Sequence, residues 1–322
     1  MIGDPLEPRT PMPIEHDALI PTWFRLGGRA ERLAYPRTVA EVERCVRADP
    51  TLRVLGDGAN LLVDDDGVDG LVISLQRGAL ADYEIGVSEA RVVAGAGVPL
   101  PKLINACVRA GLAGPERLAG IPATVGGAAA MNAGGSFGAF AELVDRVHVV
   151  SRTGALRVLE RDAIDFGYRR GVASEWIVTL VELALEPEDP ASLRDRRAEV
   201  MAYKARTQPM SERSAGCAFR NPTLERDLES IGAAGERISA GLLIDRAGCK
   251  GLAVGGASVS DRHANFVTTR QGASARDVVA LLDEVARRVR DALGVTLRRE
   301  VVVWSRDAAM ERRSTSRAES VA

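Results

Sequence analysis

The sequence predicts an α+β or mixed α/β protein, and three observations lead to this class. Stretches with the alternation of β-strands follow stretches with the periodicity of α-helices along most of the chain. Several of the strand-like stretches are short, as in small antiparallel pairs. No internal repeat with a solenoid period is present. With 322 residues, the chain is long enough for the hydrophobic cores of two or three domains.

Four stretches predict α-helices from their end signals and apolar spacing. Thr38 and Glu41 form a capping box before the first helix. Gly111 and Gly294 stand where helices commonly end, and Ser274 caps a long stretch whose apolar residues repeat at helical spacing. One predicted helix follows Thr38, and the other three cover about 99–110, 191–207 and 275–293.

Strand-like stretches fill most of the remaining chain. Residues 52–75 read as strand, glycine loop, strand, turn and strand. Further strands are predicted in 91–95, 144–152, 155–160, 175–187 and 296–304.

Composition and charge exclude several classes of protein. The formal net charge of -2 gives no sign of a nucleic-acid partner, which would favour a basic face. No apolar run is long enough to span a membrane, and the acidic, proline-rich start is no signal peptide. Four cysteines without a CxxC pair and only three histidines argue against a zinc site and indicate a reducing compartment. We expect a cytoplasmic monomer with small-molecule partners, no nucleic acid and no membrane.

The stretch GDGANLLV, residues 56–63, is a candidate phosphate-binding loop. Gly56 and Gly58 after a strand allow close approach of a ligand and let backbone N–H groups point outward. The stretch lacks the GK[ST] of a P-loop, and Leu61 stands where a Rossmann motif needs its last glycine. A tight hairpin without a ligand explains the same residues.

The stretch GIPATVGGAAAMNAGGSFG, residues 120–138, is too small to form a side-chain core and too long for a turn. A flat ligand packed directly on the backbone would explain it, with Thr124, Asn132 and Ser136 offering hydrogen bonds at its edge. The alternative is a low-complexity loop.

The stretch SAGCAFRNP, residues 214–222, places Cys217 among small and polar residues. Cys45 and Cys107 lie in helical patterns and fit as small core residues. Cys217 has four interpretations: a catalytic acid, a metal ligand, a disulfide partner of Cys249, or filler. A metal site lacks partners, and a disulfide does not suit a reducing compartment.

Seven motifs in order resemble one family, the UDP-N-acetylenolpyruvoylglucosamine reductases or MurB-type flavoenzymes. The resemblance covers about residues 18–304. The motifs are WFRLGGRAER (23–32), VLGDGANLLV (54–63), AGPERLAGIPATVGGAAAMNAG (113–134), DFGYRRG (165–171), SAGCAFRNP (214–222), AGLLIDRAGCKGLAVGGASVSDRHANF (240–266) and LRREVVVW (297–304).

The resemblance implies a fold. A two-lobed α+β FAD-binding domain of the PCMH or vanillyl-alcohol-oxidase-like type is followed by a smaller α+β substrate domain. The short connection before residue 210 implies the compact subtype, without a long tyrosine-bearing insertion. The implied divisions are a flexible leader (1–17), FAD-binding lobe 1 (18–80), FAD-binding lobe 2 (81–208), the UDP-sugar domain (209–306) and a disordered tail (307–322).

The resemblance also implies a reaction. NADPH reduces FAD, and the reduced flavin passes hydride to UDP-N-acetylglucosamine enolpyruvate, giving UDP-N-acetylmuramate for peptidoglycan synthesis. Protein side chains cannot supply hydride, so this chemistry needs a cofactor. A different flavin oxidoreductase on the same scaffold and a non-catalytic UDP-sugar-binding protein are the alternatives.

Site residues are implied by position. Arg169 matches the active-site arginine and Glu300 the active-site glutamate. Cys217 stands where most members have the serine that protonates the carbanion. Asn221 and Lys250 match positions that contact the UDP-sugar. The implied FAD-binding residues are Gly56, Asp57, Gly58, Ala59, Asn60, Leu61, Gly120, Ile121, Pro122, Ala123, Thr124, Gly126, Gly127, Asn132, Ala133 and Gly134.

Three residues depart from the family pattern. Ala59 replaces a serine in the first glycine loop, Ala123 replaces a glycine, and Gly171 replaces the serine that follows Arg169 by two positions. Loss of one neutral hydrogen bond costs on the order of 1 kcal/mol, so we expect weaker ligand binding but an intact site.

Overall fold

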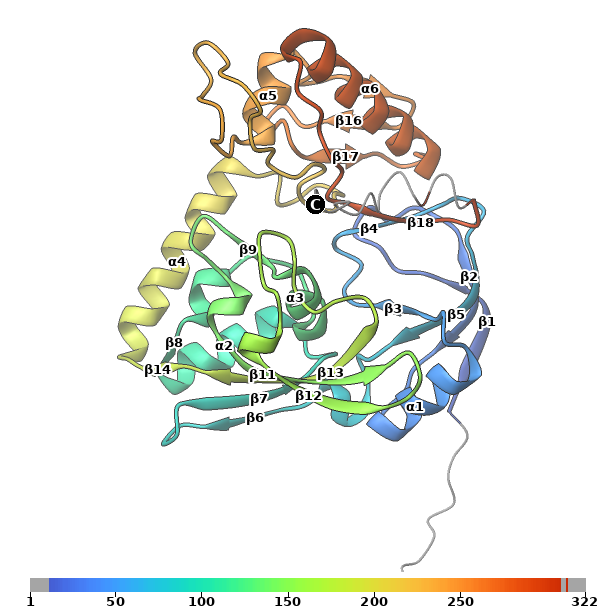
Figure 1. Cartoon of the computed structure of the whole chain (residues 1–322), viewed down its shortest axis with the longest axis vertical. Helices are drawn as coiled ribbons and strands as arrows, with labels where there is room; N and C mark the ends of the chain where they lie inside the picture. Colours follow the sequence, from blue (N-terminus) through green and yellow to red (C-terminus); the bar gives the residue numbers. More distant parts are fainter. Residues whose placement is uncertain (1–11, 308–310, 312–322) are drawn as a thin grey trace, which may run out of the picture.

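The computed structural model describes residues 12–307 and Glu311 (Figure 1). Its buried apolar side chains form three hydrophobic clusters. The first cluster draws on the region from Ala34 to Leu193, the second mainly on the region after Ala215, and the third on the region before Ile73. The expectations for residues 1–11, 308–310 and 312–322 lie outside the described residues.

A four-stranded sheet in the order β1-β2-β5-β3 builds the first part of the chain. Its strands are β1 (Ile14–Leu19), β2 (Arg29–Ala34), β3 (Arg53–Leu55) and β5 (Val68–Ser74). β1 runs antiparallel to β2, whereas β2 and β3 run parallel to β5. Helix α1 (Val39–Ala48) begins where predicted, because the Thr38 side chain accepts a hydrogen bond from the backbone N–H of Glu41.

One of the expected divisions needs correction. Strand β1 begins at Ile14 and pairs with β2, so Ile14–Asp17 belong to a sheet and not to a flexible leader. At the other end, Glu311 pairs with Arg53 at 3.2 Å, and the rest of the expected tail after Asp307 lies outside the described residues. A strand with only a few mostly exposed residues carries a weak sequence signal, because pairing with a distant partner stabilises it.

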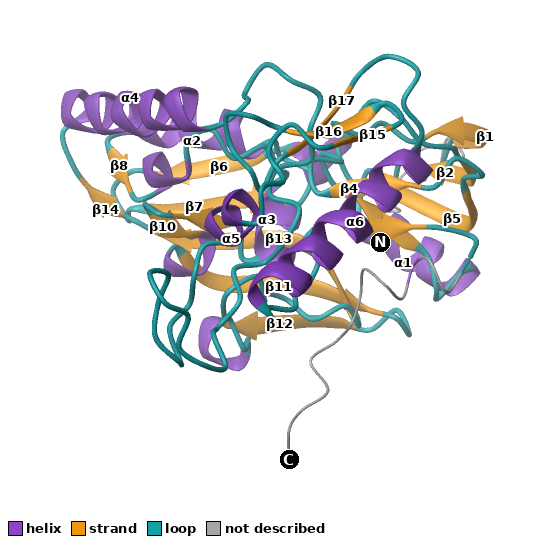
Figure 2. Ribbon diagram, turned by 90° about the horizontal axis from the view of Figure 1, so that it is seen from above, coloured by secondary structure: helices purple, strands orange, loops and turns teal. Residues whose placement is uncertain are grey.

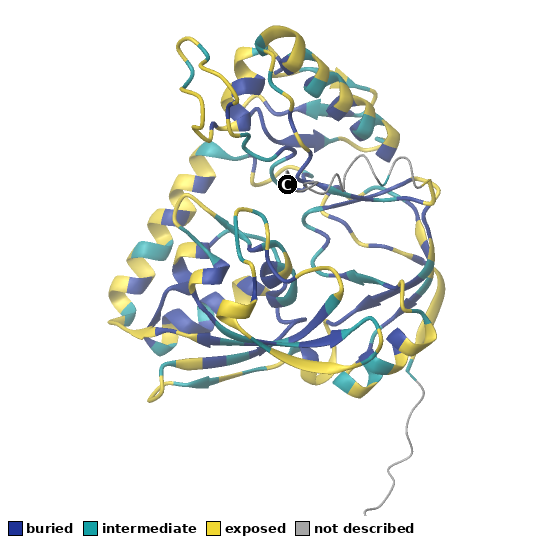
Figure 3. Ribbon diagram, in the orientation of Figure 1, coloured by how far each residue is buried: buried dark blue, intermediate teal, exposed yellow. Residues whose placement is uncertain are grey.

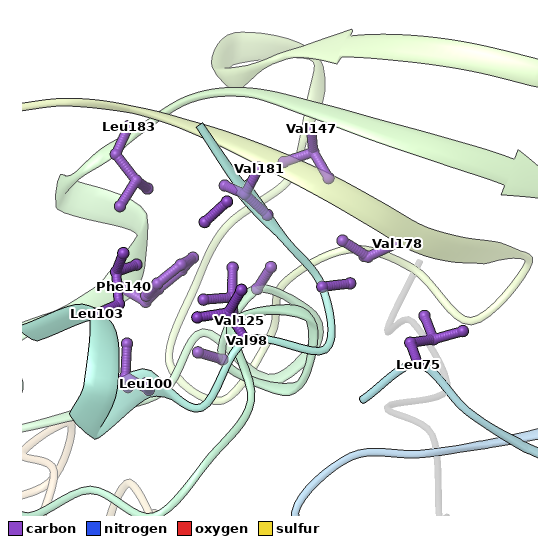
Figure 4. Packing of buried hydrophobic residues seen from close by; sticks show 14 of the residues in the cluster. Leu75, Val98, Leu100, Leu103, Val125, Phe140, Val147, Val178, Val181 and Leu183 are labelled. Carbon is purple, nitrogen blue, oxygen red and sulfur yellow. The ribbon is translucent and has the colours of Figure 1, made fainter. Parts of the chain in front are cut away.

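A five-stranded antiparallel sheet in the order β12-β11-β13-β7-β6 forms the middle of the molecule. Its strands are β6 (Tyr83–Gly86), β7 (Arg91–Gly95), β11 (Val144–Ser151), β12 (Leu156–Glu160) and β13 (Trp176–Ala184). Figure 4 shows Val147, Val181 and Leu183 of this sheet packed toward Leu103, Phe140 and Val125. This packing fixes the second glycine-rich stretch against the sheet.

Helices cover this sheet and lead to the last part of the chain. They are α2 (Leu100–Ala110), α3 (Val125–Met131) and α4 (Pro190–Thr207). Gly111 ends α2 with a φ of 71°, as the sequence predicted. Helix α4 lies at the edge of the molecule with most of its surface exposed (Figures 2 and 3). Short pieces complete this region: β8 (Leu112–Ala113), β9 (Gly134–Gly135), β10 (Gly138–Ala139), β14 (Glu186–Pro187) and 3₁₀ turns at Gly78–Ala81, Pro115–Leu118, Phe140–Glu142 and Arg161–Ala163.

The last part combines a small antiparallel sheet with two helices. The elements are β15 (Ala253–Val254), β16 (Ala257–Val259), β17 (Val267–Thr269), α5 (Ala240–Arg246) and α6 (Ala275–Leu293). Ser274 and Asp277 form a capping box at the start of α6, and its apolar face is buried. The predicted final strand shortens to β18 (Val302–Trp304), which pairs in parallel with β4 (Leu61–Val63). This pairing returns the end of the chain to the first glycine loop.

Candidate active site

A buried ion pair joins two of the three predicted catalytic residues. The Arg169 Nε donates to Glu300 Oε1 at 2.5 Å, and the two side chains are 18% and 9% exposed. Burial raises the pKa of Glu300, and Arg169 opposes that shift. Burial also disfavours the charge of Arg169, but Glu300, Tyr168 and Cys217 together outweigh burial, and the pKa of Arg169 is raised. A contact of this length is typical of a charge-assisted hydrogen bond between a guanidinium and a carboxylate.

A tight turn between β12 and β13 presents Arg169. Gly167 and Arg170 exchange backbone hydrogen bonds of 2.8 and 3.0 Å, and Arg169 adopts a left-handed φ of 54° between them. Its Nη1 donates to the carbonyl of Gly134 at 3.0 Å. A non-glycine residue at positive φ is costly, and such strain is often found where a side chain must be aimed. The turn therefore fixes the guanidinium between the second glycine stretch and Glu300.

Backbone contacts bring Glu300 to the other two parts of the site. The Glu300 N–H donates to the carbonyl of Ala218 at 2.8 Å, and its carbonyl accepts from Asn60 Nδ2 at 3.1 Å. Its Oε2 atom is buried and has no partner within the described residues. The hydrogen-bonding capacity of this carboxyl oxygen is therefore unused by the described residues.

Cys217 is a free thiol near the charges of Glu300 and Arg169. It forms an isolated antiparallel bridge with Phe266 next to the Ala218 contact with Glu300. Burial raises the pKa of the Cys217 thiol to about 12; Glu300 raises it further, while Arg169 and the Asn265 side chain act in the opposite direction. The thiol is therefore neutral at physiological pH and holds a proton.

The other interpretations of Cys217 receive no support. Cys217 and Cys249 are both free, so the alternative of a disulfide between them is wrong. Within the described residues, no cluster of three or more histidine, cysteine or acidic side chains is placed to hold a metal ion.

Tyr168 is a site residue that the sequence analysis missed. Its hydroxyl accepts a hydrogen bond from the Asn221 N–H at 3.1 Å, and the Arg237 guanidinium lies 4.5 Å from its ring centre. Burial raises the pKa of Tyr168, and Glu300 raises it further. The one signal for Tyr168 in the sequence was its position next to Arg169 in FGYRR. Its contact with Asn221 in the stretch 214–222 is tertiary, so the sequence does not reveal it.

The two predicted substrate residues differ in position. Asn221 lies beside Tyr168, and its Oδ1 accepts a hydrogen bond at 2.9 Å from the N–H of Ala240, the first residue of helix α5. Lys250 instead pairs with Asp245 at 2.8 Å and is half-exposed. In the described part of the chain, no contact joins Lys250 to Arg169 or Glu300.

The two glycine stretches face each other beside these residues. A Cβ added to Gly56 would lie 3.1 Å from Thr124 Oγ1 and 4.0 Å from the Cα of Gly127. Thr124 caps α3 by accepting from the N–H of Gly127 at 3.1 Å. Both stretches are therefore parts of one cradle.

The first stretch has the donors of an anion site. The N–H groups of residues 57–60 meet no acceptor within the described residues. Gly58 has a φ of +66°, and a Cβ there would lie 2.3 Å from the Pro21 carbonyl oxygen. Gly56 and Asp57 also line a cavity of about 290 Å³. A row of free N–H groups beside open space suits a phosphate.

Several of the predicted cofactor residues also have a role in protein packing. A Cβ on Gly126 would meet Ala96 at 2.7 Å, and one on Gly134 would meet the Gly138 carbonyl oxygen at 2.6 Å. Asn132 donates to the Gly167 carbonyl and accepts from the Ala141 N–H, so its amide holds the Arg169 turn in place. Of the remaining predicted residues, Gly120, Ile121, Pro122, Ala123 and Ala133 are partly exposed, as are Ala59 and Asn60, while Leu61 is buried in β4.

Two family models match different parts of this chain. A family model described as an FAD binding domain matches residues 30–160, which defines the class: a two-lobed α+β FAD-binding protein. A model of the C-terminal domain of UDP-N-acetylenolpyruvoylglucosamine reductase matches residues 208–304.

Relatives and a solved structure narrow the class to one family. Reductases of this name from Heliobacterium modesticaldum and Alkalilimnicola ehrlichii are 40% and 41% identical, over 88% and 87% of this chain and 87% and 90% of theirs. The crystal structure of the reductase (MurB) from Thermus caldophilus matches with a TM-score of 0.73 and 39% identity, over 88% of this chain and 95% of that one. The chain belongs to the UDP-N-acetylenolpyruvoylglucosamine reductase family.

Proposed function

We propose that this chain reduces UDP-N-acetylglucosamine enolpyruvate to UDP-N-acetylmuramate, with NADPH as reductant and FAD as carrier. The observation that carries the proposal is the convergence of Arg169, Glu300 and the neutral Cys217 thiol beside the glycine cradle. Family membership supports the substrate. The free N–H groups of residues 57–60 and the backbone of 120–124 fit the pyrophosphate and the flat ring of FAD.

Arg169 and Glu300 have the groups to hold the substrate carboxylate. FAD held by the two glycine stretches would supply hydride, taken from NADPH, for the terminal carbon of the enol ether. Negative charge then develops beside the carboxylate, and fixed donors stabilise it. The Arg169 Nη2 has no partner within the described residues and can face that carboxylate. The substrate's negative charge moves the pKa of Glu300 further upward, which favours a protonated Oε2 as donor.

Cys217 supplies the proton that completes the reduction. The Sγ–H bond breaks, the proton goes to the carbon that carries the developing negative charge, and a thiolate remains. An unperturbed thiol is far more acidic than a serine hydroxyl, and burial reduces that difference at Cys217. Asn221, joined to Tyr168, is proposed to contact the UDP-sugar, and Lys250 is proposed as a more distant contact.

The division of the chain at residues 80, 208 and 306 remains part of the proposal, as do a monomeric state and a cytoplasmic location. No helix among the described residues combines the length and apolarity that crossing a membrane requires.

The visible spectrum of the purified chain tests the cofactor, and half-reactions test the substrate. The protein should be yellow, NADPH should bleach it, and the enolpyruvyl substrate should restore the colour. A bleached protein that the substrate leaves bleached would point to another flavin reductase. A colourless protein that binds UDP-sugar would point to a non-catalytic binding protein.

Cys217 has its own test in the same half-reactions. Cys217→Ala should leave bleaching by NADPH unchanged and slow reoxidation by substrate by about 100-fold or more, within the usual range for a lost general acid. Cys217→Ser should keep most of the activity. Wild-type reoxidation in the alanine variant would remove the thiol from the reaction.

A further inference from the structure

Asn265 holds the backbone of the Cys217 segment by both ends of its amide. Its Oδ1 accepts from the Phe219 N–H at 2.9 Å and its Nδ2 donates to the Phe219 carbonyl at 2.8 Å, so it pairs with Phe219 as a neighbouring strand would. Its own carbonyl accepts from the Ala218 N–H at 2.7 Å. The residue is only 2% exposed. These contacts fix residues 217–219 against the segment that contains Phe266.

The amide that holds Phe219 lies against the short segment that carries the thiol, because the Asn265 carbonyl also accepts from the Ala218 N–H. Nδ2 carries two hydrogens, and the bond to Phe219 uses one of them. The Asn265 side chain acts as a hydrogen-bond donor that lowers the pKa of the Cys217 thiol, against the larger opposite effect of burial. A thiolate benefits more than a thiol from an N–H donor, because a charged acceptor makes the stronger bond.

Neighbouring charges explain why such a donor matters. Once Cys217 has given up its proton, the sulfur becomes an anion at a partly buried position, where the Glu300 carboxylate disfavours its charge. Arg169 is the nearby cation, and Glu300 already engages its Nε. A neutral amide can stabilise the anion without attracting the proton back.

We propose that Asn265 is a positioning residue for the reaction: it holds the Cys217 sulfur at the reacting carbon and donates an N–H to the thiolate that proton transfer leaves. The inference rests on the proposed role of Cys217. It predicts that Asn265 affects reoxidation of the flavin by substrate and leaves reduction by NADPH unchanged.

Thiol alkylation tests the contact without turnover. Asn265→Asp keeps the shape of the side chain but, ionised or protonated, has no N–H to offer the sulfur. Iodoacetamide labelling at pH 8.5, read at Cys217 by mass spectrometry, should slow about tenfold, which corresponds to one pKa unit. Cys45, Cys107 and Cys249 in the same samples report any general loosening. Asn105→Asp on α2, whose amide accepts from Arg197, is the matched control and should label Cys217 at the wild-type rate. An unchanged labelling rate in Asn265→Asp would overturn the contact.

A double-mutant cycle separates positioning from mere packing. Asn265→Ala should slow reoxidation by substrate at least tenfold, with bleaching by NADPH and the substrate KM within twofold of wild type. In a Cys217→Ala background the same change should add almost nothing, because both changes remove one function. Losses that multiply, or equal losses in both half-reactions, would mean that Asn265 is structural only.

The outcomes for Cys217 and Asn265 remain distinguishable. If Cys217→Ala reacts normally while Asn265→Asp slows labelling, the proposed acid is wrong and Asn265 has no thiolate to serve in turnover. If Cys217→Ala is slow and Asn265→Ala is not, the acid stands and the positioning role falls.

Discussion

At the residue scale, the proposed reaction depends on three side chains, Arg169, Glu300 and Cys217, whose pKa values burial shifts. Arg169 and Glu300 form an ion pair. Either side chain buried without its partner would cost free energy, because an unpaired buried charge loses its hydration. The Cys217 thiol remains protonated because burial raises its pKa to about 12. Sequence position indicated all three residues, but neither the pairing nor the protonation could be read from neighbours in the chain.

Arg169→Met should destabilise the protein by about 3–5 kcal/mol, because it leaves the Glu300 carboxylate buried without its partner. Urea unfolding monitored by fluorescence measures the loss. Arg169→Met combined with Glu300→Gln should recover a large part of it. A loss below about 1 kcal/mol in the single variant would instead match an exposed pair.

The pH dependence of reoxidation by substrate should show no decline near the ordinary thiol pKa of about 8.5. Because the Cys217 pKa is raised to about 12, the donating form persists across that range, and loss of the proton would begin only at much higher pH. Stopped-flow measurement of the reoxidation rate from about pH 6 to about pH 10 gives the profile. A fall centred near pH 8.5 in the wild type but not in Cys217→Ser would contradict this assignment.

At the scale of elements, capping residues and C-terminal glycines predicted the long helices. The short helices α3 and α5 were not predicted, because their glycine content or short length weakens the helical pattern. Capping residues marked the starts of α1 and α6, and Gly111 marked the end of α2. Helix α3 was missed because its glycines lower helix propensity; Thr124 capping and packing on β13 stabilise it. Helix α5 was missed because seven residues carry too little periodicity.

Gly171 shows how an element explains a departure from the family pattern. A Cβ at this position would lie 1.9 Å from the Ala129 carbonyl oxygen of α3, and the next residue, Val172, donates to that same oxygen. The glycine lets the Arg169 turn approach α3 closely. Its effect is therefore on packing, beyond the lost hydrogen bond that the sequence suggested.

Gly171→Ser should destabilise the protein by about 1–3 kcal/mol, because the turn or α3 must shift to make room. Differential scanning calorimetry measures the change. Gly135→Ser is the control, since a Cβ there meets nothing within 4 Å. Equal melting temperatures for the two variants would show that α3 has room for the side chain.

At the scale of the whole molecule, the site exists only where distant parts meet. Asn60 in the first part donates to the Glu300 carbonyl, Arg169 in the middle part pairs with its side chain, and β18 returns to β4. The largest hydrophobic cluster runs from Ala34 to Leu193 and so crosses the expected boundary at residue 80. The two FAD-binding lobes therefore share a core and hold the cradle between them.

Removal of FAD should lower the stability of the whole chain, because a ligand that binds only the folded state stabilises it by mass action. At 100 times the dissociation constant the gain is about 2.7 kcal/mol, so the stripped protein should melt several degrees lower. Thermal scans of stripped and refilled protein measure the shift. Identical melting temperatures would argue against a ligand held in the cradle.

The sequence by itself determined the α+β class, the family, the ends of the long helices and the positions of Arg169, Cys217 and Glu300. These follow from local signals: caps, periodicity and motifs that each lie within a short stretch. Tertiary structure alone decided the Arg169–Glu300 pair, the neutral state of Cys217, the contacts of Tyr168 and Asn265, and the packing role of Gly171. Burial, and contact between residues far apart in the chain, set these properties, and neither quantity is written in a local stretch of sequence.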